Sequence, residues 1–247
     1  MKTLALMLVM LFGSGCTNLK EKPNDFVMLS EVDPTIIQDV RYSTKENFLG
    51  RPAVGYKTTK IACTKKAAES LKQAHDYFKS QGYNLVVYDA YRPQRAVNDF
   101  RAWGNDLNDL GNKASYYPTL EKKDLFKLGY IAGEKSSHTR GSTFDLTLIK
   151  AGAKLKPIVV SKRKLSQGDE IVFLDDNTVD MGSSFDLFHE ISHHDSKLTS
   201  PEHNAMRNLL REGMKRFGFK EYKEEWWHYT LENEPYPDTY FDFVVEE

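Results

Sequence analysis

Segments with helical periodicity and segments with strand periodicity follow one another along this chain without regular alternation, and this order constrains the fold most. Residues 64–81 place apolar side chains at helical spacing, and residues 83–91 form a short apolar run typical of a buried strand. Further helices are predicted over 94–103 and 201–218, and a further strand over 142–149. A doubly wound sheet needs strands and helices in alternation, so the order predicts an α+β fold.

The sequence also indicates where the first helix begins and ends, and which side chains share a face of the predicted strand. Thr64 is placed to cap the first helix, and Gly82 to end it. In the strand over 142–149, apolar side chains on one face alternate with Asp145, Thr147 and Ile149 on the other. We therefore expect this strand to be half-buried.

Three remaining segments connect or close the predicted elements. Residues 105–120 indicate a long loop, and residues 219–232 have the composition of a strand. Residues 150–179 carry an excess of lysine and arginine, which is compatible either with a binding patch or with a solvated β-hairpin. The hairpin is the commoner meaning of such a run, so we expect a hairpin here.

The size and charge of the chain narrow its possible partners. With 247 residues, 40% of them hydrophobic, it is long enough to bury the core of one domain. Its 34 basic and 35 acidic side chains give a formal net charge of -1, so no overall positive field attracts nucleic acid. A small or neutral partner is expected, and no nucleic acid.

The first residues have the layout of a bacterial export signal. Lys2, an apolar run and the small residues "GSGC" predict a signal peptide over 1–16, which is too short to span a membrane. The ending resembles a lipobox, so we expect Cys16 to carry lipid; simple cleavage and release is the alternative. Residues 17–25 then form a tether, and residues 26–247 the domain. The expected location is the periplasm or cell envelope, with membrane contact only through this anchor.

The domain has no cysteine pair to stabilise it. If lipid occupies Cys16, only Cys63 remains, so no internal disulfide forms and the core must supply the stability. Cys63 lies at the start of an amphipathic segment and is interpreted as a small buried apolar residue, without a chemical role.

The segment "FDLFHEISHHD" contains the letters of a zinc-protease motif. His189, Glu190 and His193 match the pattern in which two histidines one helical turn apart bind zinc, and Glu212 would be the candidate third ligand. The surrounding residues leave little room for the long helix that this motif needs, because polar residues and Pro201 follow. We therefore expect the match to be incidental.

A second set of candidate ligands begins at "SSHTRGSTFD". His138 precedes a turn at Gly141, which brings the imidazole back towards Asp145 at the start of a strand. Further along, "EEWWHY" places Glu225 and His228 beside two tryptophans, where burial would require each polar group to have a strong partner. A metal with bound water could provide it; a tryptophan pair in the core is the alternative.

These pieces together resemble the zinc-dependent D-alanyl-D-alanine dipeptidases, the family of the vancomycin-resistance dipeptidases. The likeness runs through nearly the whole predicted domain, in "VRYSTKENFLGRPAVGY", "YDAYRPQRAV", "SYYP", "KSSHTRGSTFDLTL", "MGSSFDLF" and "EWWHYTLENEPYPDTYFDF". The family is related to the D,D-carboxypeptidases and to the hedgehog fold. The resemblance implies that fold here, with a central, mainly antiparallel sheet flanked by helices.

The resemblance also implies a metal centre. One Zn²⁺ per chain would be held by His138, Asp145 and His228, with a fourth position for water. Glu225 matches the general base of the family. Arg92 matches the guanidinium that stabilises the oxyanion, and an ion pair with Asp89 is an additional or alternative role for it.

Other residues match the substrate contacts of the family. Asp186 corresponds to the carboxylate that binds the free ammonium of the dipeptide, and Ser136 and Tyr42 fall at further substrate-contact positions. The connection over 150–179 is longer than is usual in the family, which bears on how open the cavity entrance is.

The implied activity is hydrolysis of D-Ala-D-Ala to two D-alanines. One alternative is a D,D- or L,D-carboxypeptidase that trims peptidoglycan stem peptides with the same metal ligands. Another is a zinc-binding module that recognises cell-wall fragments without catalysis. Asp186 favours the dipeptide, and Glu225 with Arg92 favours an enzyme.

Overall fold

A five-stranded sheet forms the centre of the protein in the computed structural model, which describes residues 20–165 and 167–246. One pairing, between β2 and β4, is parallel and the other three are antiparallel. The predicted α+β fold with a mainly antiparallel sheet is thus confirmed. In spatial order the strands are β2 (Ile37–Gln38), β4 (Tyr83–Asp89), β5 (Thr143–Lys150), β9 (Glu225–Leu231) and β8 (Phe219–Tyr222).

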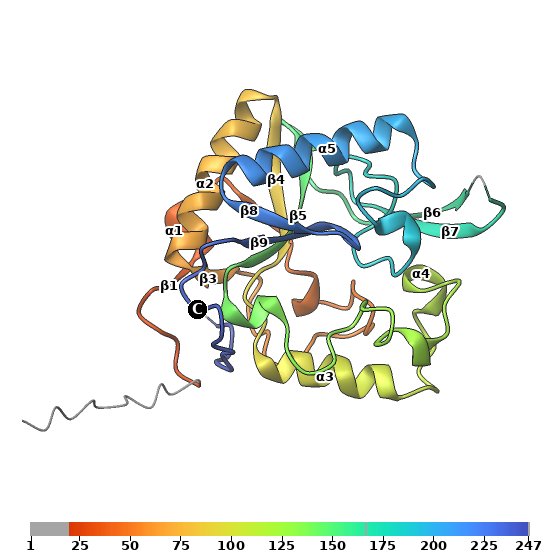
Figure 1. Ribbon diagram of the computed structural model, residues 1–247, viewed down its shortest axis with the longest axis horizontal. Helices are drawn as coiled ribbons and strands as arrows, with labels where there is room; N and C mark the ends of the chain where they lie inside the picture. Colours follow the sequence, from red (N-terminus) through yellow and green to blue (C-terminus); the bar gives the residue numbers. More distant parts are fainter. Residues whose placement is uncertain (1–19, 166, 247) are drawn as a thin grey trace, which may run out of the picture.

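Three helices cover the sheet. Helices α2 (Lys65–Ser80) and α5 (Pro201–Arg216) pack against each other and against β4 and β8, respectively. Helix α3 (Gln94–Asn105) lies on the opposite side, below the sheet in Figure 1. The space between the sheet and α3 contains the loops that build the candidate site.

The first helix follows the sequence prediction closely. The hydroxyl of Thr64 accepts a hydrogen bond from the Ala67 amide and caps α2. The apolar positions of this helix are buried: Ala67, Ala68, Leu71, Ala74 and Phe78. Helix α5 is similarly capped by Ser200 and buries Leu210 and Met214 against the core.

The expectation of a half-buried strand at β5 is wrong. Seven of its eight residues are buried, on both faces. The sequence alternates because one face carries polar side chains, but these are buried as well, and Asp145 among them lines the candidate site. Asp145 is 2% exposed and Thr147 is fully buried.

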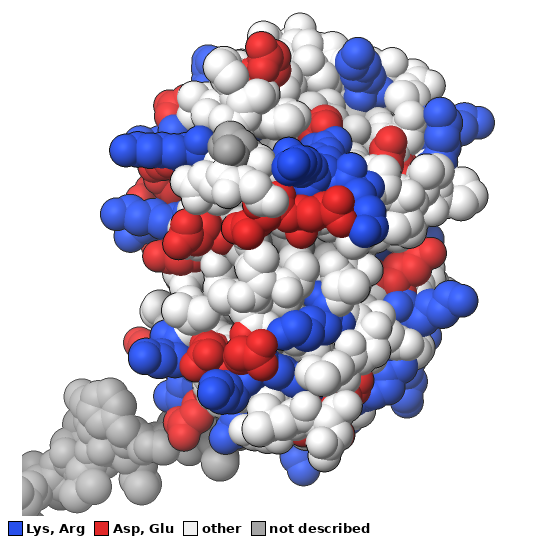
Figure 2. Space-filling view, turned by 90° about the vertical axis from the view of Figure 1, so that its right-hand side faces the viewer, with Lys and Arg blue, Asp and Glu red and all other residues white. Residues whose placement is uncertain are grey.

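The basic segment forms the expected hairpin. Strands β6 (Val159–Lys164) and β7 (Glu170–Asp175) pair in an antiparallel ladder. Acidic partners accompany its cations, as in the contacts Lys162–Glu170 and Arg163–Asp180. Figure 2 shows basic and acidic side chains interspersed on this face, so the hairpin does not form a patch of one sign.

Short elements complete the chain. Strands β1 (Phe26–Met28) and β3 (Ala62–Thr64) pair with each other, and residues 105–120 form the expected connection apart from one helical turn, α4 (Lys113–Tyr116). The remaining short helices are α1 (Leu29–Val32), η1 (Arg41–Ser43), η2 (Lys122–Asp124), η3 (Ser137–Arg140) and η4 (Glu190–Ser192).

The cysteine and N-terminal predictions have different outcomes. Cys63 is free and fully buried, as expected, and burial raises the pKa of its thiol. The predicted signal peptide, Cys16 and the start of the tether lie outside the described residues, so they stay predictions. Across the described part of the chain, no helix combines the length and apolar character required to cross a bilayer.

Candidate active site

Three chain segments bring the predicted metal ligands together. His138 lies in η3, directly before the turn at Gly141; Asp145 lies on β5; and His228 lies on β9. Gly141 has a φ of 83°, and a Cβ at this position would overlap the ring of Phe26. Only glycine fits at this turn, which leads the chain from His138 into β5.

The sheet register fixes the second and third ligands side by side. Asp145 is the cross-strand partner of His228 on one side and of Asp89 on the other. Directly opposed residues project to the same face of a sheet. This row therefore brings Asp145 and His228 together, and it places Asp89 beside them, where it accepts hydrogen bonds from Tyr56 and Arg92.

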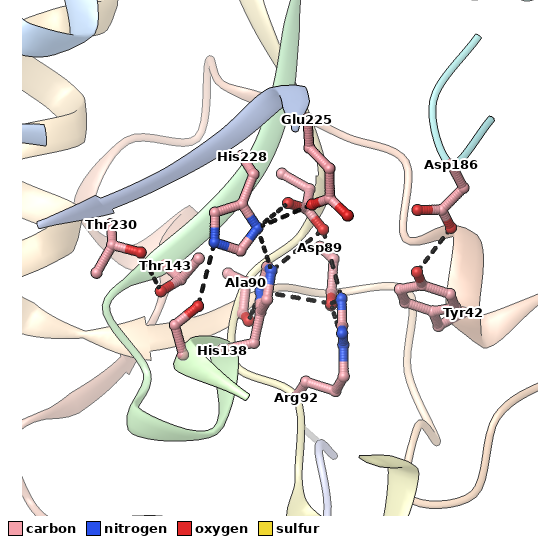
Figure 3. A network of polar contacts seen from close by, with 12 residues as sticks. Tyr42, Asp89, Ala90, Arg92, His138, Thr143, Asp186, Glu225, His228 and Thr230 are labelled. Atoms are coloured by element: carbon pink, nitrogen blue, oxygen red, sulfur yellow. Dashed lines mark hydrogen bonds and ion pairs between the residues drawn. The ribbon is translucent and has the colours of Figure 1, made fainter. Parts of the chain in front are cut away.

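The ligand atoms converge closely (Figure 3). His138 Nε2 lies 3.2 Å from Asp145 Oδ2, and His228 Nδ1 lies 3.2 Å from Asp145 Oδ1. The two histidine nitrogens are themselves 3.2 Å apart. Among the described residues, this is the one group of three such side chains whose donor atoms lie within 4.8 Å of one another.

Contacts behind the histidines fix which ring nitrogen faces the centre. His138 Nδ1 donates to the carbonyl oxygen of Ala90 at 2.8 Å, which leaves Nε2 as an acceptor directed inward. His228 Nε2 lies 3.1 Å from Ser137 Oγ, and donation to this hydroxyl leaves Nδ1 free to bind a metal. Such outer contacts are typical of metal-binding histidines. Ser137 was not predicted from the sequence.

The electrostatics of the cluster favour a cation. Burial lowers the pKa of His228, but the nearby carboxylates of Asp145 and Glu225 outweigh burial and raise the pKa to about 9. Burial raises the pKa of Asp145, but His138 and His228 hold it well below its usual range. Asp145 Oδ1 is buried and accepts no hydrogen bond of good geometry. Two imidazoles and one carboxylate around this point fit the ligand set of a catalytic divalent metal.

An irregularity in the pairing of β8 with β9 brings Glu225, the predicted base, close to His228. Glu225 and His228 are three residues apart and would lie on opposite faces of a regular strand. The register shifts between Glu221 and Tyr222 of β8, and this bulge turns both side chains to the same side. Glu225 Oε2 consequently lies 3.4 Å from His228 Nδ1.

The tryptophan pair between these two residues is part of the core. Trp226 and Trp227 are 3% and 1% exposed and meet edge to face at 5.3 Å. Trp226 donates from Nε1 to Ser183 Oγ at 2.9 Å, and Trp227 packs on Phe185. The pair thus fixes both the strand that carries Glu225 and the loop opposite it.

Arg92 reaches the site from the segment between β4 and α3. Its Nε donates to Asp89 Oδ2 at 2.9 Å, so the ion pair considered from the sequence is present. Its guanidinium also lies 3.4 Å from Asp145 Oδ2 and stacks over the rings of Tyr42 and Phe100. These contacts hold a permanent positive charge beside the ligand cluster.

Asp186 and Tyr42 form a separate part of the site, to the right of the cluster in Figure 3. Tyr42 donates its hydroxyl to Asp186 Oδ2 at 2.7 Å. Burial and the charge of Asp145 raise the pKa of Asp186 well above its usual range. Its φ of 59° lies in the left-handed region, which non-glycine residues rarely adopt. A strained, buried carboxylate of this kind is suited to an incoming cation.

One cavity of about 450 Å³ connects these groups. This volume is within the usual range for small-molecule sites. Every predicted metal-binding, catalytic and substrate-contact residue of the domain lines it, Ser136 included. Its walls also include groups that the sequence did not single out: Phe48, Phe100, Tyr130, Lys135, Phe188 and Tyr222.

The zinc-protease motif at 189–193 does not form a metal centre. The segment folds as the single turn η4, and the His189 side chain caps it by accepting from the Ile191 amide. His193 instead contacts the hydroxyl of Tyr130. Across the described residues, neither histidine joins a group of three converging ligands, nor does Glu212.

The long connection over 150–179 does not narrow the cavity. None of its described residues lines the cavity wall. The hairpin packs elsewhere: Leu165 and Ile171 form a small apolar cluster with Leu187 and Ile191, on the segment that carries Asp186.

Comparison with known proteins identifies a family that matches most of the chain. The family described as D-ala-D-ala dipeptidase, Peptidase M15, matches residues 22–158 and 165–246, and the unmatched residues between them are those of β6.

Curated relatives cover nearly the whole chain. A D-alanyl-D-alanine dipeptidase of Enterococcus faecium is 39% identical over 90% of this chain and 98% of its own length. One of Streptomyces coelicolor is 38% identical with the same coverage, and one of Escherichia coli is 27% identical over 84% of each chain. The extent of the family match and the identity to these relatives show that the chain belongs to the D-Ala-D-Ala dipeptidase family of metallopeptidases, Peptidase M15.

Proposed function

We propose that this protein is a zinc-dependent dipeptidase that hydrolyses D-Ala-D-Ala to two D-alanines. The observation that carries the proposal is the convergence of His138, Asp145 and His228 in a cavity that also contains Glu225. The names of the family and of the curated relatives supply the substrate. Zinc is the metal that best suits two imidazoles, one carboxylate and an open position.

In the proposed centre the metal would activate water, and side chains of the protein would transfer protons and stabilise charge. A zinc ion held by such ligands acts as a Lewis acid and lowers the pKa of water. Glu225 is placed to take a proton from the attacking water and to return it to the departing amine. The fixed charge of Arg92 stabilises negative charge that develops on the scissile carbonyl oxygen. No covalent bond between the substrate and a side chain is required.

Asp186 accounts for the preference for a free dipeptide. Its buried carboxylate is costly without a cationic partner, and the substrate ammonium provides one. Tyr42 holds the carboxylate in place, and Ser136 lines the same cavity as a further polar contact. A peptide with a blocked amine leaves Asp186 unpaired, so it is a poor substrate.

The test is cleavage of D-Ala-D-Ala by the purified protein, measured as released D-alanine. We expect full loss of activity after removal of metal with a chelator, and recovery on addition of Zn²⁺. A parallel assay with a stem pentapeptide separates the dipeptidase from a carboxypeptidase. Binding of either peptide without hydrolysis by the zinc-loaded protein would support the non-catalytic module instead.

The cellular location is part of the same proposal. An exported enzyme, attached to the envelope by lipid on Cys16, meets small dipeptides outside the cytoplasm and needs neither nucleic acid nor a membrane-spanning segment. The signal layout over 1–16 and the formal net charge of -1 support this assignment. Replacement of Cys16 by serine should release the protein from the membrane fraction; retention there would contradict the lipid anchor.

A further inference from the structure

Residues 181–193, called the Asp186 loop below, hold the predicted ammonium site with almost no regular structure. The loop contains only the single turn η4. At its centre Asp186 has a left-handed φ of 59°, which costs free energy for a residue with a Cβ. Contacts from outside the loop must therefore keep the carboxylate in the cavity.

Arg207 of α5 ties the two ends of this loop together. Its side chain is buried, with 1% of the residue exposed. Its Nε donates to the carbonyl oxygen of Met181 at 2.6 Å, and its Nη1 donates to that of His193 at 2.7 Å. A third nitrogen lies 3.4 Å from Ser183 Oγ. One planar guanidinium thus spans the base of the loop.

The surroundings of Arg207 are unusual for a buried cation. Its hydrogen-bond acceptors are two carbonyl groups and a hydroxyl, and no carboxylate of the described residues forms an ion pair with it. Burial lowers its pKa to about 9. An apolar side chain would fill this position without the desolvation cost, so the donor geometry of arginine is what the site uses.

The network continues from Arg207 to the residue next to Asp186. Ser183 Oγ accepts from Trp226 Nε1 and lies 3.0 Å from Ser192 Oγ. Ser192 in turn donates to the carbonyl oxygen of Leu187 at 2.6 Å. A continuous set of hydrogen bonds therefore joins α5, the strand that carries Glu225 and Leu187, the residue that follows Asp186.

We propose that Arg207 is a positioning residue for substrate binding, which holds the Asp186 loop so that its carboxylate meets the substrate ammonium. The inference rests on the proposed function, because it assigns the loop to the amino end of the dipeptide. Arg207 contacts neither the metal ligands nor the cavity, so its effect falls on KM and much less on kcat.

Two variants test the role. Arg207→Lys keeps the charge but cannot span both carbonyls, and Ser192→Ala removes the hydroxyl that donates to the Leu187 carbonyl. For both we expect a KM for D-Ala-D-Ala raised ~10-fold or more, in line with the cost of displacing a binding group by about 1 Å, with kcat within ~3-fold. Hydrogen exchange of the loop amides should become faster. If Arg207→Lys does not fold, Ser192→Ala carries the test.

A double-mutant cycle separates positioning from general stability. In an Asp186→Asn background, Arg207→Lys should raise KM little further, because both changes act on the same contact. Arg211→Lys is the matched control, since this arginine lies one turn along α5 and pairs with Asp195. Fully multiplicative effects, or wild-type KM and wild-type exchange in both single variants, would overturn the inference while dipeptide hydrolysis stands. An inactive wild-type enzyme would remove the proposed function and this inference together.

Discussion

Replacement of Glu225 by glutamine tests the proposed chemistry most directly. The two side chains have nearly the same shape, so glutamine fits in the place of Glu225, whose Oε2 lies 3.4 Å from His228 Nδ1. The amide carries no charge and cannot take a proton from water. His138, Asp145 and His228 are untouched, so the variant should still bind one metal ion.

The size of the effect follows from the role assigned to the carboxylate. A positioned general base contributes ~10²–10⁴ in rate, which corresponds to about 3–5 kcal/mol of activation free energy. Arg92 and the metal remain in Glu225→Gln, and they supply the residual rate. We therefore expect kcat to fall by ~10²–10⁴, with a much smaller change in KM.

The assay is release of D-alanine, measured together with the metal content of the same sample. Loss of a negative charge beside His228 weakens metal affinity, so the variant is assayed with excess Zn²⁺. Glu224→Gln is the matched control, because this neighbouring carboxylate does not line the cavity. A metal-loaded Glu225→Gln enzyme with kcat within ~10-fold of wild type would refute the general-base role.

Other predictions follow from the same geometry. His189→Ala and His193→Ala should keep full metal content and turnover, and metal loss from both would revive the zinc-protease interpretation. Because His189 caps η4, its replacement should also lower the free energy of unfolding by about 0.5–2 kcal/mol. Asp186→Asn should weaken substrate binding by about 2–5 kcal/mol, which raises KM on the order of 30-fold or more. An N-acylated dipeptide is a poor substrate of the wild type already, and Asp186→Asn should have the same kcat/KM for it as the wild type. Gly213→Ala places a methyl group against the ring of Phe78, where α5 packs on α2. The overlap should lower the free energy of unfolding, measured by urea denaturation, by about 1–3 kcal/mol. An unchanged denaturation midpoint would show that the two helices can move apart without cost.

Local patterns in the sequence were sufficient for the three long helices, α2, α3 and α5. Helix α2 forms where the spacing of Ala67, Leu71 and Phe78 and the cap at Thr64 agree, because capping and burial both act within one or two turns. The burial of β5 could not be predicted in the same way. Alternation shows that one face is polar, but not whether that face meets water or a buried site.

The ligand set came from family resemblance, because chain spacing alone does not show that distant residues meet. The return at Gly141 was visible, since only one turn separates His138 from β5. The bulge that turns Glu225 towards His228 depends on pairing between β8 and β9, and no local pattern revealed it. Ser137 could have been suspected only from its position beside His138. No local pattern pointed to Arg207, because its acceptors are backbone carbonyls of another segment.

The cross-strand row of Asp89, Asp145 and His228 links the ligand cluster to the way in which the chain assembles. A slip of one residue between β5 and β9 would send His228 to the far face and separate the chelating atoms. These two strands are distant in sequence, and contacts of this kind are slow to form. A bound ion therefore stabilises only molecules whose final strand has paired correctly, and the metal stoichiometry of a refolded sample measures the fraction of chains that reached that pairing.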